Sequence, residues 1–185
     1  MIGRVSMNYV VIDLEATCWP ERTKVADMEI IEIGAVKLSE DRLQAISEYS
    51  RFIRPIANPV LTDFCTNLTT ISQQEVDRAS PFPIVLEDFL KWIGEERITL
   101  CSWGNYDIEQ LKADCKRHHL RFPNQFNRHL NLKEEFARQR GSRPCGYMAA
   151  MNFLNIHPAG THHRGIDDAR NIAEIAQRVI PRLNT

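Results

Sequence analysis

The pattern of hydrophobic and polar positions along the chain predicts a mixed α/β fold. Residues 8–13 are a nearly continuous run of β-favouring apolar residues, which is typical of a central strand that is covered on both faces. Further apolar runs predict four more strands, at residues 30–38, 45–53, 98–102 and 126–131. Short polar connections favour antiparallel pairing of the first three strands.

Apolar positions at helical spacing predict a series of helices in the rest of the chain. They lie at residues 72–79, 84–93, 107–119, 132–139, 145–154 and 166–182, while the rest of 61–83 is predicted to be irregular. Helices that alternate with strands after an antiparallel trio indicate a mixed five-stranded sheet with helices on both faces. In such sheets, ligand sites gather where strands end and helices begin.

Length and composition are ordinary for a globular protein. The 185 residues are 43% hydrophobic and 25% charged, so we expect one domain over residues 1–185 with room for a sizeable core. The formal net charge of −1 lacks the basic excess that is usual in nucleic-acid binders, although it does not exclude a local basic rim. Lysines and arginines at 112–121 and 138–143 are candidates for that rim, but each cluster alone more often marks a solvated helix face.

The cysteines and the apolar stretches indicate a reduced, cytoplasmic protein. The five cysteines are widely spread and include no CxxC pair, so neither a disulfide framework nor a zinc knuckle is predicted. No signal peptide is visible, and no stretch approaches the ~20 apolar residues of a membrane span. We therefore expect no association with a membrane.

Acidic residues at three separate places are the candidate chemistry. Asp13 and Glu15 end the first strand and, being two residues apart, project to the same side of it. Asp107 falls in the first turn of a predicted helix, and Asp168 opens the last helix, five residues after His163. Four carboxylates and one imidazole suit two divalent cations and a base that activates water, which is the equipment for cutting a phosphodiester.

Each of these places also has a plainer interpretation. Acidic residues commonly end a strand at the surface, and Asp107 alone would do no more than complement a helix dipole. Helical phasing makes the third place more selective, because Asp168 lies at the edge of the apolar stripe and Asp167 lies on a polar face. An inward Asp168 needs a partner such as a cation, since an unpaired buried charge is costly. His162, next to His163, is expected to be an exposed loop residue.

Three segments together resemble the DEDDh exonucleases of the ribonuclease H-like superfamily. They are residues 13–18 (DLEATC), 102–107 (SWGNYD) and 163–171 (HRGIDDARN). The middle regions 61–71 (LTDFCTNLTTI) and 76–79 (VDRA) look like the Eri-type branch, which includes the histone-mRNA 3′-exonuclease. The resemblance extends over nearly the whole chain with its motifs in the right order.

The resemblance implies a ribonuclease H-like fold and a 3′→5′ exonuclease that releases nucleoside 5′-monophosphates. It implies that Asp13, Glu15, Asp107 and Asp168 hold two divalent cations, Mg²⁺ or Mn²⁺, which in such sites lie roughly 3.5–4 Å apart. His163 would take the proton of the attacking water, and Glu15 counts with it among the catalytic residues.

The resemblance also suggests where the substrate lies. Phe64 and Tyr106 would flank the terminal base, and the backbone near Ala16 would meet the 3′-hydroxyl. Aromatic stacking holds any base and so would not select a sequence. Ordinary core packing is an equal alternative for both rings. Tyr106 departs from the histone-mRNA enzyme, which has tryptophan there.

Single-stranded RNA 3′ ends are the leading substrate hypothesis. A DNA-directed exonuclease of the proofreading or repair type is the alternative, because it shares the catalytic motifs and only the Eri-like middle region favours RNA. An inactive nucleic-acid-binding scaffold is less favoured, because all four carboxylates and the histidine are present. The sequence does not identify protein partners. Glu32 is expected either to support a metal ligand through a hydrogen bond or to pair with an arginine.

Overall fold

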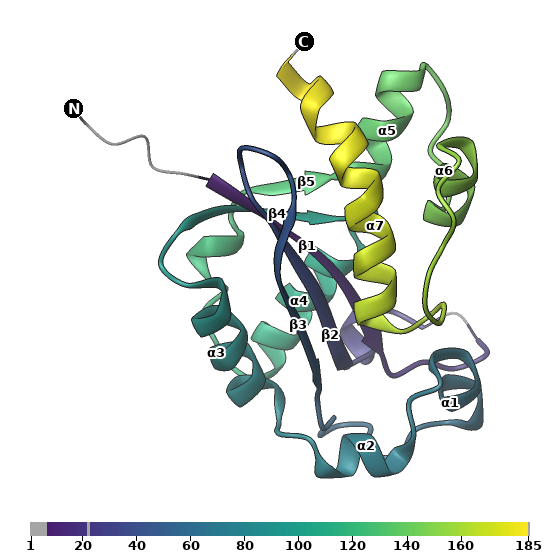
Figure 1. The fold of residues 1–185 in the computed structure, drawn as a ribbon. Coiled ribbons are helices and arrows are strands. Elements are labelled where there is room, and N and C mark those ends of the chain that lie inside the picture. The colour runs from purple at the N-terminus through teal and green to yellow at the C-terminus, as the bar shows by residue number, and fades with distance from the viewer. Residues whose placement is uncertain (1–6, 22, 185) are drawn as a thin grey trace.

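The computed structural model describes residues 7–21 and 23–184, with a five-stranded sheet at the centre (Figure 1). The strands are β1 (Met7–Ala16), β2 (Ile30–Leu38), β3 (Ala45–Phe52), β4 (Arg97–Ser102) and β5 (His129–Asn131), in the spatial order β3-β2-β1-β4-β5. β2 pairs antiparallel with β1 and β3, whereas β4 pairs in parallel with β1 and β5. The predicted mixed sheet is therefore confirmed. Residues 1–6, 22 and 185 of the predicted domain lie outside the described residues.

β1 lies at the centre of the sheet because both of its faces are apolar. Val10, Val11 and Ile12 have no exposed surface. Val10 and Ile12 belong to one hydrophobic core, and Val11 belongs to the other. Alternate side chains of a strand point to opposite faces, so a strand that is covered on both sides reads as a continuous apolar run.

Helices cover both faces of this sheet, as the sequence pattern predicted (Figure 1). Five of them are α3 (Phe82–Ile93), α4 (Tyr106–Arg117), α5 (Leu132–Arg140), α6 (Tyr147–Phe153) and α7 (Gly165–Val179). α3 and α4 pack into the core on one face, and α5, α6 and α7 pack into the core on the other. Within the described ranges, no helix is long and apolar enough to cross a membrane.

Two short helices occupy the segment between β3 and α3, where one helix in an irregular stretch was expected. α2 (Gln73–Arg78) confirms the helix predicted at 72–79, but α1 (Asp63–Thr69) was missed. The Thr62 hydroxyl caps α1 by accepting a hydrogen bond from the Cys65 N–H, and Thr70 ends α1 in the left-handed conformation. Seven residues are too few for hydrophobic periodicity to reveal a helix, so the capping threonine was the signal to read.

Short 3₁₀ turns account for two further differences from the predicted boundaries. These turns are η1 (Val25–Asp27), η2 (Asn124–Phe126) and η3 (Ile180–Asn184). Phe126 was predicted to begin a strand, but it ends η2 and is buried in the core, and β5 begins only at His129. α7 ends at Val179 because the proline at 181 has no N–H to continue the helical hydrogen bonds.

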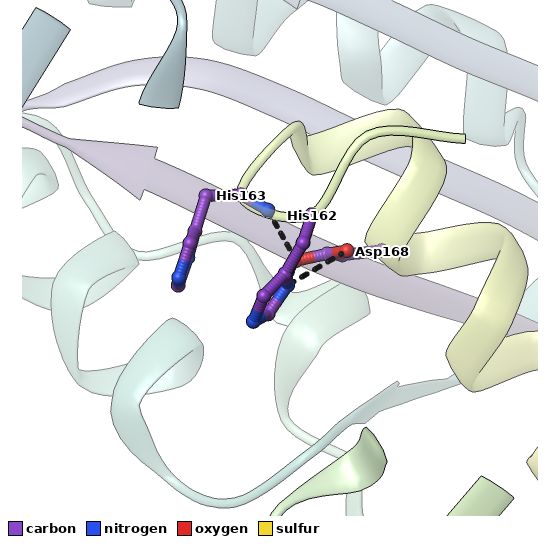
Figure 2. Close-up of side chains that lie close together, drawn as sticks. All are labelled: His162, His163 and Asp168. Atoms are coloured by element: carbon purple, nitrogen blue, oxygen red, sulfur yellow. Dashed lines mark hydrogen bonds and ion pairs between the residues drawn. The ribbon is translucent and has the colours of Figure 1, made fainter. Parts of the chain in front are cut away.

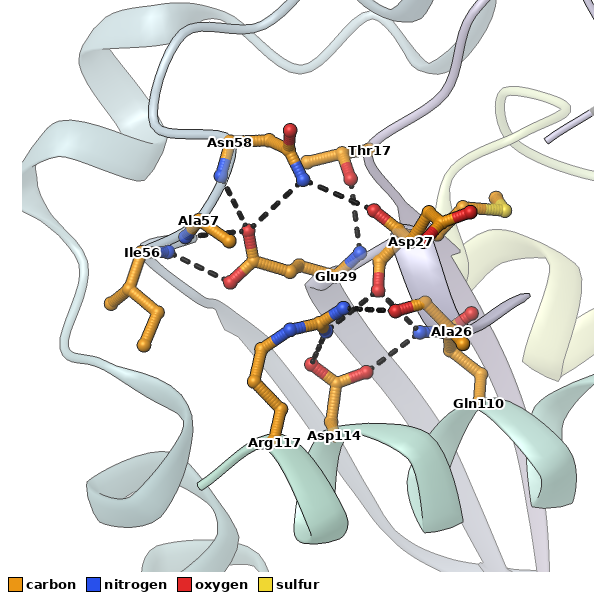
Figure 3. A network of polar contacts seen from close by, with 11 residues as sticks. Thr17, Ala26, Asp27, Glu29, Ile56, Ala57, Asn58, Gln110, Asp114 and Arg117 are labelled. Atoms are coloured by element: carbon orange, nitrogen blue, oxygen red, sulfur yellow. Dashed lines mark hydrogen bonds and ion pairs between the residues drawn. The ribbon is translucent and has the colours of Figure 1, made fainter. Parts of the chain in front are cut away.

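A buried polar network ties the connection between β1 and β2 to α4 (Figure 3). Arg117 donates a hydrogen bond to the Met28 carbonyl at 2.8 Å, and Gln110 donates to the same oxygen at 3.0 Å. The adjacent Glu29 carboxylate accepts hydrogen bonds from the backbone N–H groups of residues 56–58. Since these partners satisfy the buried charges, the network holds in place the chain that follows β1.

Candidate active site

The end of β1 and the first turns of α4 and α7 bring four carboxylates together. Asp13, Glu15 and Asp168 each offer an oxygen atom, and these atoms lie within 4.8 Å of one another. Asp107 approaches from α4, and its Oδ1 accepts a hydrogen bond from the Leu14 N–H at 3.0 Å. The four acidic residues that the sequence singled out thus lie at one place in the fold.

Two glycines let the start of α7 lie directly on the sheet. A Cβ atom at Gly34 would lie 2.0 Å from the backbone carbonyl carbon of Gly165, and a Cβ at Gly165 would lie 3.0 Å from the Asp13 carbonyl oxygen. Gly34 is also the residue that pairs with Asp13 across the sheet. The helix therefore begins over this pair, which brings Asp168 to the carboxylates of β1. Neither glycine was predicted to have this role, although the position of Gly34 inside a strand pattern signals a close backbone approach.

Glu32, whose role the sequence left open, fixes the start of α7. It has no exposed surface, and its Oε2 accepts hydrogen bonds from the Gly165 N–H at 3.0 Å and from the Arg164 Nε at 3.3 Å. A carboxylate at a helix N-terminus is also favoured by the helix dipole. Glu32 is thus both a partner for an arginine and a support for the helix that carries Asp168.

The two neighbouring aspartates of α7 face different surroundings, as the helical phasing predicted. Asp168 is 2% exposed and faces the other carboxylates. Asp167 accepts hydrogen bonds from the Thr161 N–H at 2.9 Å and from Arg170 at 3.0 Å. Asp167 therefore fastens the loop that precedes α7 and takes no part in the carboxylate group.

Both histidines of that loop contact Asp168 (Figure 2). The backbone N–H of His163 donates to the Asp168 Oδ2 at 3.1 Å, and the ring Nδ1 of His162 lies 3.1 Å from the same oxygen. His162 is exposed, as expected, but its ring is held by this contact. Tyr147 of α6 donates its hydroxyl hydrogen to the Asp168 Oδ1. Tyr147 was missed, because no local pattern links a residue of α6 to one of α7.

Burial and, for Glu15 and Asp13, the charges of neighbouring carboxylates raise the pKa values at this site. Burial raises the pKa of Glu15 to about 8, and the charges of Asp168 and Glu32 add to the shift. Burial also raises the pKa of Asp107 to about 7. Burial, followed by the charges of Asp107 and Glu15, raises the pKa of Asp13 well above its ordinary value. A divalent cation would offset this repulsion, and a donor set made of oxygen atoms suits a hard cation.

The three expected substrate-binding residues lie on three different elements. Ala16 ends β1 and is buried, and Tyr106 is the first residue of α4, directly before Asp107. Phe64 lies on α1. Phe64 and Tyr106 are 39% and 36% exposed, so each residue keeps part of its surface in contact with solvent.

Comparison with known proteins identifies the family. The sequence model of an exonuclease family, RNase_T, matches residues 10–176. The chain belongs to this exonuclease family. Among curated relatives of this exonuclease domain, ERI1 exoribonuclease 2 of Xenopus laevis is 32% identical over 193 residues, which cover 92% of this chain and 28% of the relative. The chain thus spans little more than a quarter of the length of that relative.

Solved structures agree with this placement. The nuclease domain of 3′hExo, described as a DEDDh family member bound to rAMP, superposes with a TM-score of 0.89 at 29% identity and covers 96% of this chain and 93% of its own. A 3′-exonuclease described in 3′-end specific recognition of a histone mRNA stem-loop superposes with a TM-score of 0.90 at 27% identity, over 96% of this chain and 64% of its own. The ribonuclease H-like fold and the resemblance to the Eri-type DEDDh exonucleases are confirmed.

Proposed function

We propose that this exonuclease domain is a metal-dependent 3′→5′ exoribonuclease that shortens single-stranded RNA and releases nucleoside 5′-monophosphates. The observation that carries the proposal is the convergence of Asp13, Glu15, Asp107 and Asp168 at the end of β1. RNA as the substrate is supported by the name of the relative, an exoribonuclease, and by the rAMP and histone mRNA of the two structural relatives.

The four carboxylates would hold two divalent cations, for which we propose Mg²⁺ or Mn²⁺. When bound, such ions activate water and stabilise the charge of the leaving oxygen. The chain itself supplies the fixed positions of the ligands. The Leu14 N–H holds the Asp107 carboxylate, and Tyr147 with the His163 N–H holds that of Asp168. Ligands held by such partners need little rearrangement when a cation binds.

His163 is the general base in this proposal, with Glu15 as the catalytic carboxylate beside it. Burial, followed by the charge of His162, lowers the pKa of His163. A lowered pKa keeps the imidazole neutral near physiological pH, where it can accept a proton from water. The hydrogen bond from the backbone N–H of His163 to Asp168 keeps the residue next to the carboxylates.

Base stacking accounts for the exposed rings of Phe64 and Tyr106, which would flank the 3′-terminal base, while the backbone at Ala16 would meet the 3′-hydroxyl. Stacking on an aromatic ring contributes about 1–3 kcal/mol per base and tolerates any base. Cleavage would therefore depend little on the sequence of the 3′ end. All five cysteines are free, which supports the reducing, cytoplasmic compartment that we propose for this domain.

A time course on 5′-labelled RNA and on DNA of the same sequence tests the proposal, with Mg²⁺, Mn²⁺ or EDTA in parallel. We expect a ladder of products shortened from the 3′ end, faster on RNA, that needs a metal ion and is lost in Asp13→Ala. Asp41→Ala is the matched control, because Asp41 is an exposed acid on the turn between β2 and β3.

The named outcomes separate the parts of the proposal. Shortening that persists in EDTA or in Asp13→Ala would contradict the metal-dependent site. Faster shortening of the DNA strand than of the RNA strand would instead identify a DNA exonuclease. No shortening of either strand by folded protein that binds metal would leave a nucleic-acid-binding role.

A further inference from the structure

We propose that His162, His163 and Asp168 form a binding site for a transition-metal cation of the zinc type, and that an ion bound there inhibits the exonuclease. The inhibition rests on the proposed function, whereas the binding itself does not. The site lies on the loop before α7 and shares one residue, Asp168, with the carboxylate group of β1.

The geometry already gathers the ligand atoms. Each of the three residues offers one nitrogen or oxygen atom, and these atoms lie within 4.8 Å of one another. The His162 Nδ1 is 3.1 Å from the Asp168 Oδ2, and the two imidazole rings stack with their centroids 3.8 Å apart (Figure 2). The Tyr147 hydroxyl donates to the Asp168 Oδ1 and also lies 2.7 Å from the His162 Nδ1, so it holds both groups in place. Zinc–nitrogen bonds are about 2.0–2.1 Å long, so a bound ion would draw these three donors closer together around it.

The donor types separate this site from the carboxylate group. Two imidazoles and a carboxylate, with a fourth position left to water, are a common zinc arrangement. Mg²⁺ prefers oxygen ligands and binds imidazole poorly. Asp13, Glu15 and Asp168 offer only oxygen atoms, so a hard cation favours them and a zinc-type cation favours the histidines.

Binding at the histidines would remove two parts of the proposed machinery at once. A ring nitrogen of His163 that ligates zinc has no lone pair left to accept a proton from water. The Asp168 carboxylate would be shared with a second cation and would hold the catalytic one less well. The side chain of His162 is 47% exposed, so a cation can reach it from solvent.

Zinc binding to the metal-free protein is the direct test, measured by calorimetry or by competition with a chromophoric chelator. We expect wild-type protein to bind one Zn²⁺ at this site and His162→Ala to bind it at least about tenfold more weakly, because one of three ligands is lost. His157→Ala is the matched control, since His157 is an exposed histidine outside the cluster and its loss should leave zinc affinity unchanged.

The inhibition is then measured on RNA with Mg²⁺ present, and each variant is compared with its own rate in the absence of zinc. We expect micromolar zinc to slow wild-type protein and His157→Ala, and to slow His162→Ala much less. Equal zinc affinity in wild-type protein and His162→Ala would overturn the site, and equal inhibition of the two would overturn the regulation. If the protein cleaved no RNA, the proposed function would fail while the binding experiment would still decide the zinc site.

Discussion

Gly34 on β2 and Gly165 at the start of α7 are in backbone contact, so close that a Cβ atom on Gly34 would lie 2.0 Å from the Gly165 carbonyl carbon. This contact sets the height of α7 above the sheet. Because Gly34 pairs with Asp13, the contact also sets the distance from Asp13 to Asp168, the inward-facing acidic residue in the first turn of the helix. The geometry of the carboxylate group thus depends on two residues that carry no side chain.

Gly34→Ala should therefore damage both stability and cleavage. The added methyl group meets backbone atoms, which cannot rotate away, and overpacking of this kind typically costs about 1–3 kcal/mol of folding free energy. A shift of α7 would also move Asp168 away from Asp13. Thermal melting and the rate of RNA shortening measure the two effects.

Gly146→Ala is the control for that substitution. In the described part of the chain, a Cβ atom at Gly146 meets no atom within 4 Å, and the residue does not have a positive φ. Its melting temperature and rate should stay near those of wild-type protein. A Gly34→Ala protein that melts and cleaves as Gly146→Ala does would show that α7 tolerates displacement.

Asp168→Asn should abolish cleavage, whereas Asp167→Asn should keep most of it. Asp168 is buried among the ligand carboxylates, and an amide there removes a negative charge and a cation ligand. Asp167 accepts the Thr161 N–H, and an asparagine oxygen can still accept it. Cleavage rates of the two variants, each checked for folding by circular dichroism, provide the comparison. Equal loss in both would mean that the loop held by Asp167 is as important as the ligand.

Local sequence periodicity could predict the orientation of Asp168 but not the way that α7 reaches the sheet. The 3.6-residue period of a helix decides which face a residue takes, so Asp167 and Asp168 were told apart without a structure. The alternation of a strand likewise put Asp13 and Glu15 on one side. The Gly34 contact joins elements far apart in the chain, and no local period encodes it.

The same limit explains the other omissions. Glu32 was visible as a charge within an apolar strand, but its partner, the N–H of Gly165, lies on another element. Tyr147 reaches Asp168 from α6 through tertiary packing alone. α1 is a seven-residue helix, shorter than two full turns, and Thr62 was its clearest local signal.

Tyr147→Phe should weaken the binding of the divalent cation more than it weakens the fold. The substitution removes the hydroxyl that donates to the Asp168 carboxylate and keeps the ring. Loss of such a partner of a metal ligand typically costs about 10–100-fold in metal affinity or activity. We therefore expect the Mg²⁺ concentration that gives half-maximal cleavage to rise by roughly tenfold.

Tyr49→Phe is the matched control for this experiment. The Tyr49 hydroxyl is also hydrogen-bonded, to the Val85 carbonyl at 3.2 Å and to Asp88 at 3.0 Å, but these partners lie on α3. Tyr49→Phe should therefore lower the melting temperature without changing the Mg²⁺ concentration that gives half-maximal cleavage. A Mg²⁺ titration that moves equally in both variants would assign the effect of Tyr147 to general destabilisation.

The stability of the metal-free protein should fall as the pH rises from about 5 to 8. Burial, followed by the neighbouring charges, raises the pKa of Glu15 from its ordinary value of 4.5 to about 8. Burial raises the pKa of Asp107 from 3.8 to about 7. The folded state then binds protons more tightly than the unfolded state, so ionisation of these groups favours unfolding. The penalty begins near the ordinary values and is complete above the raised ones, and it is on the order of a few kcal/mol.

Melting curves of wild-type protein and Glu15→Gln in EDTA isolate this effect from the titration of the rest of the chain. The two proteins should differ little near pH 5, and Glu15→Gln should become the more stable one at pH 8, because its amide cannot ionise. Mg²⁺ should raise the melting temperature of wild-type protein more at pH 8 than at pH 5, since a cation binds the ionised carboxylates. Parallel curves for the two proteins from pH 5 to 8 would show that Glu15 ionises in the fold as readily as in the unfolded chain, and the crowding of carboxylates at the end of β1 would then not be the force that recruits the cation.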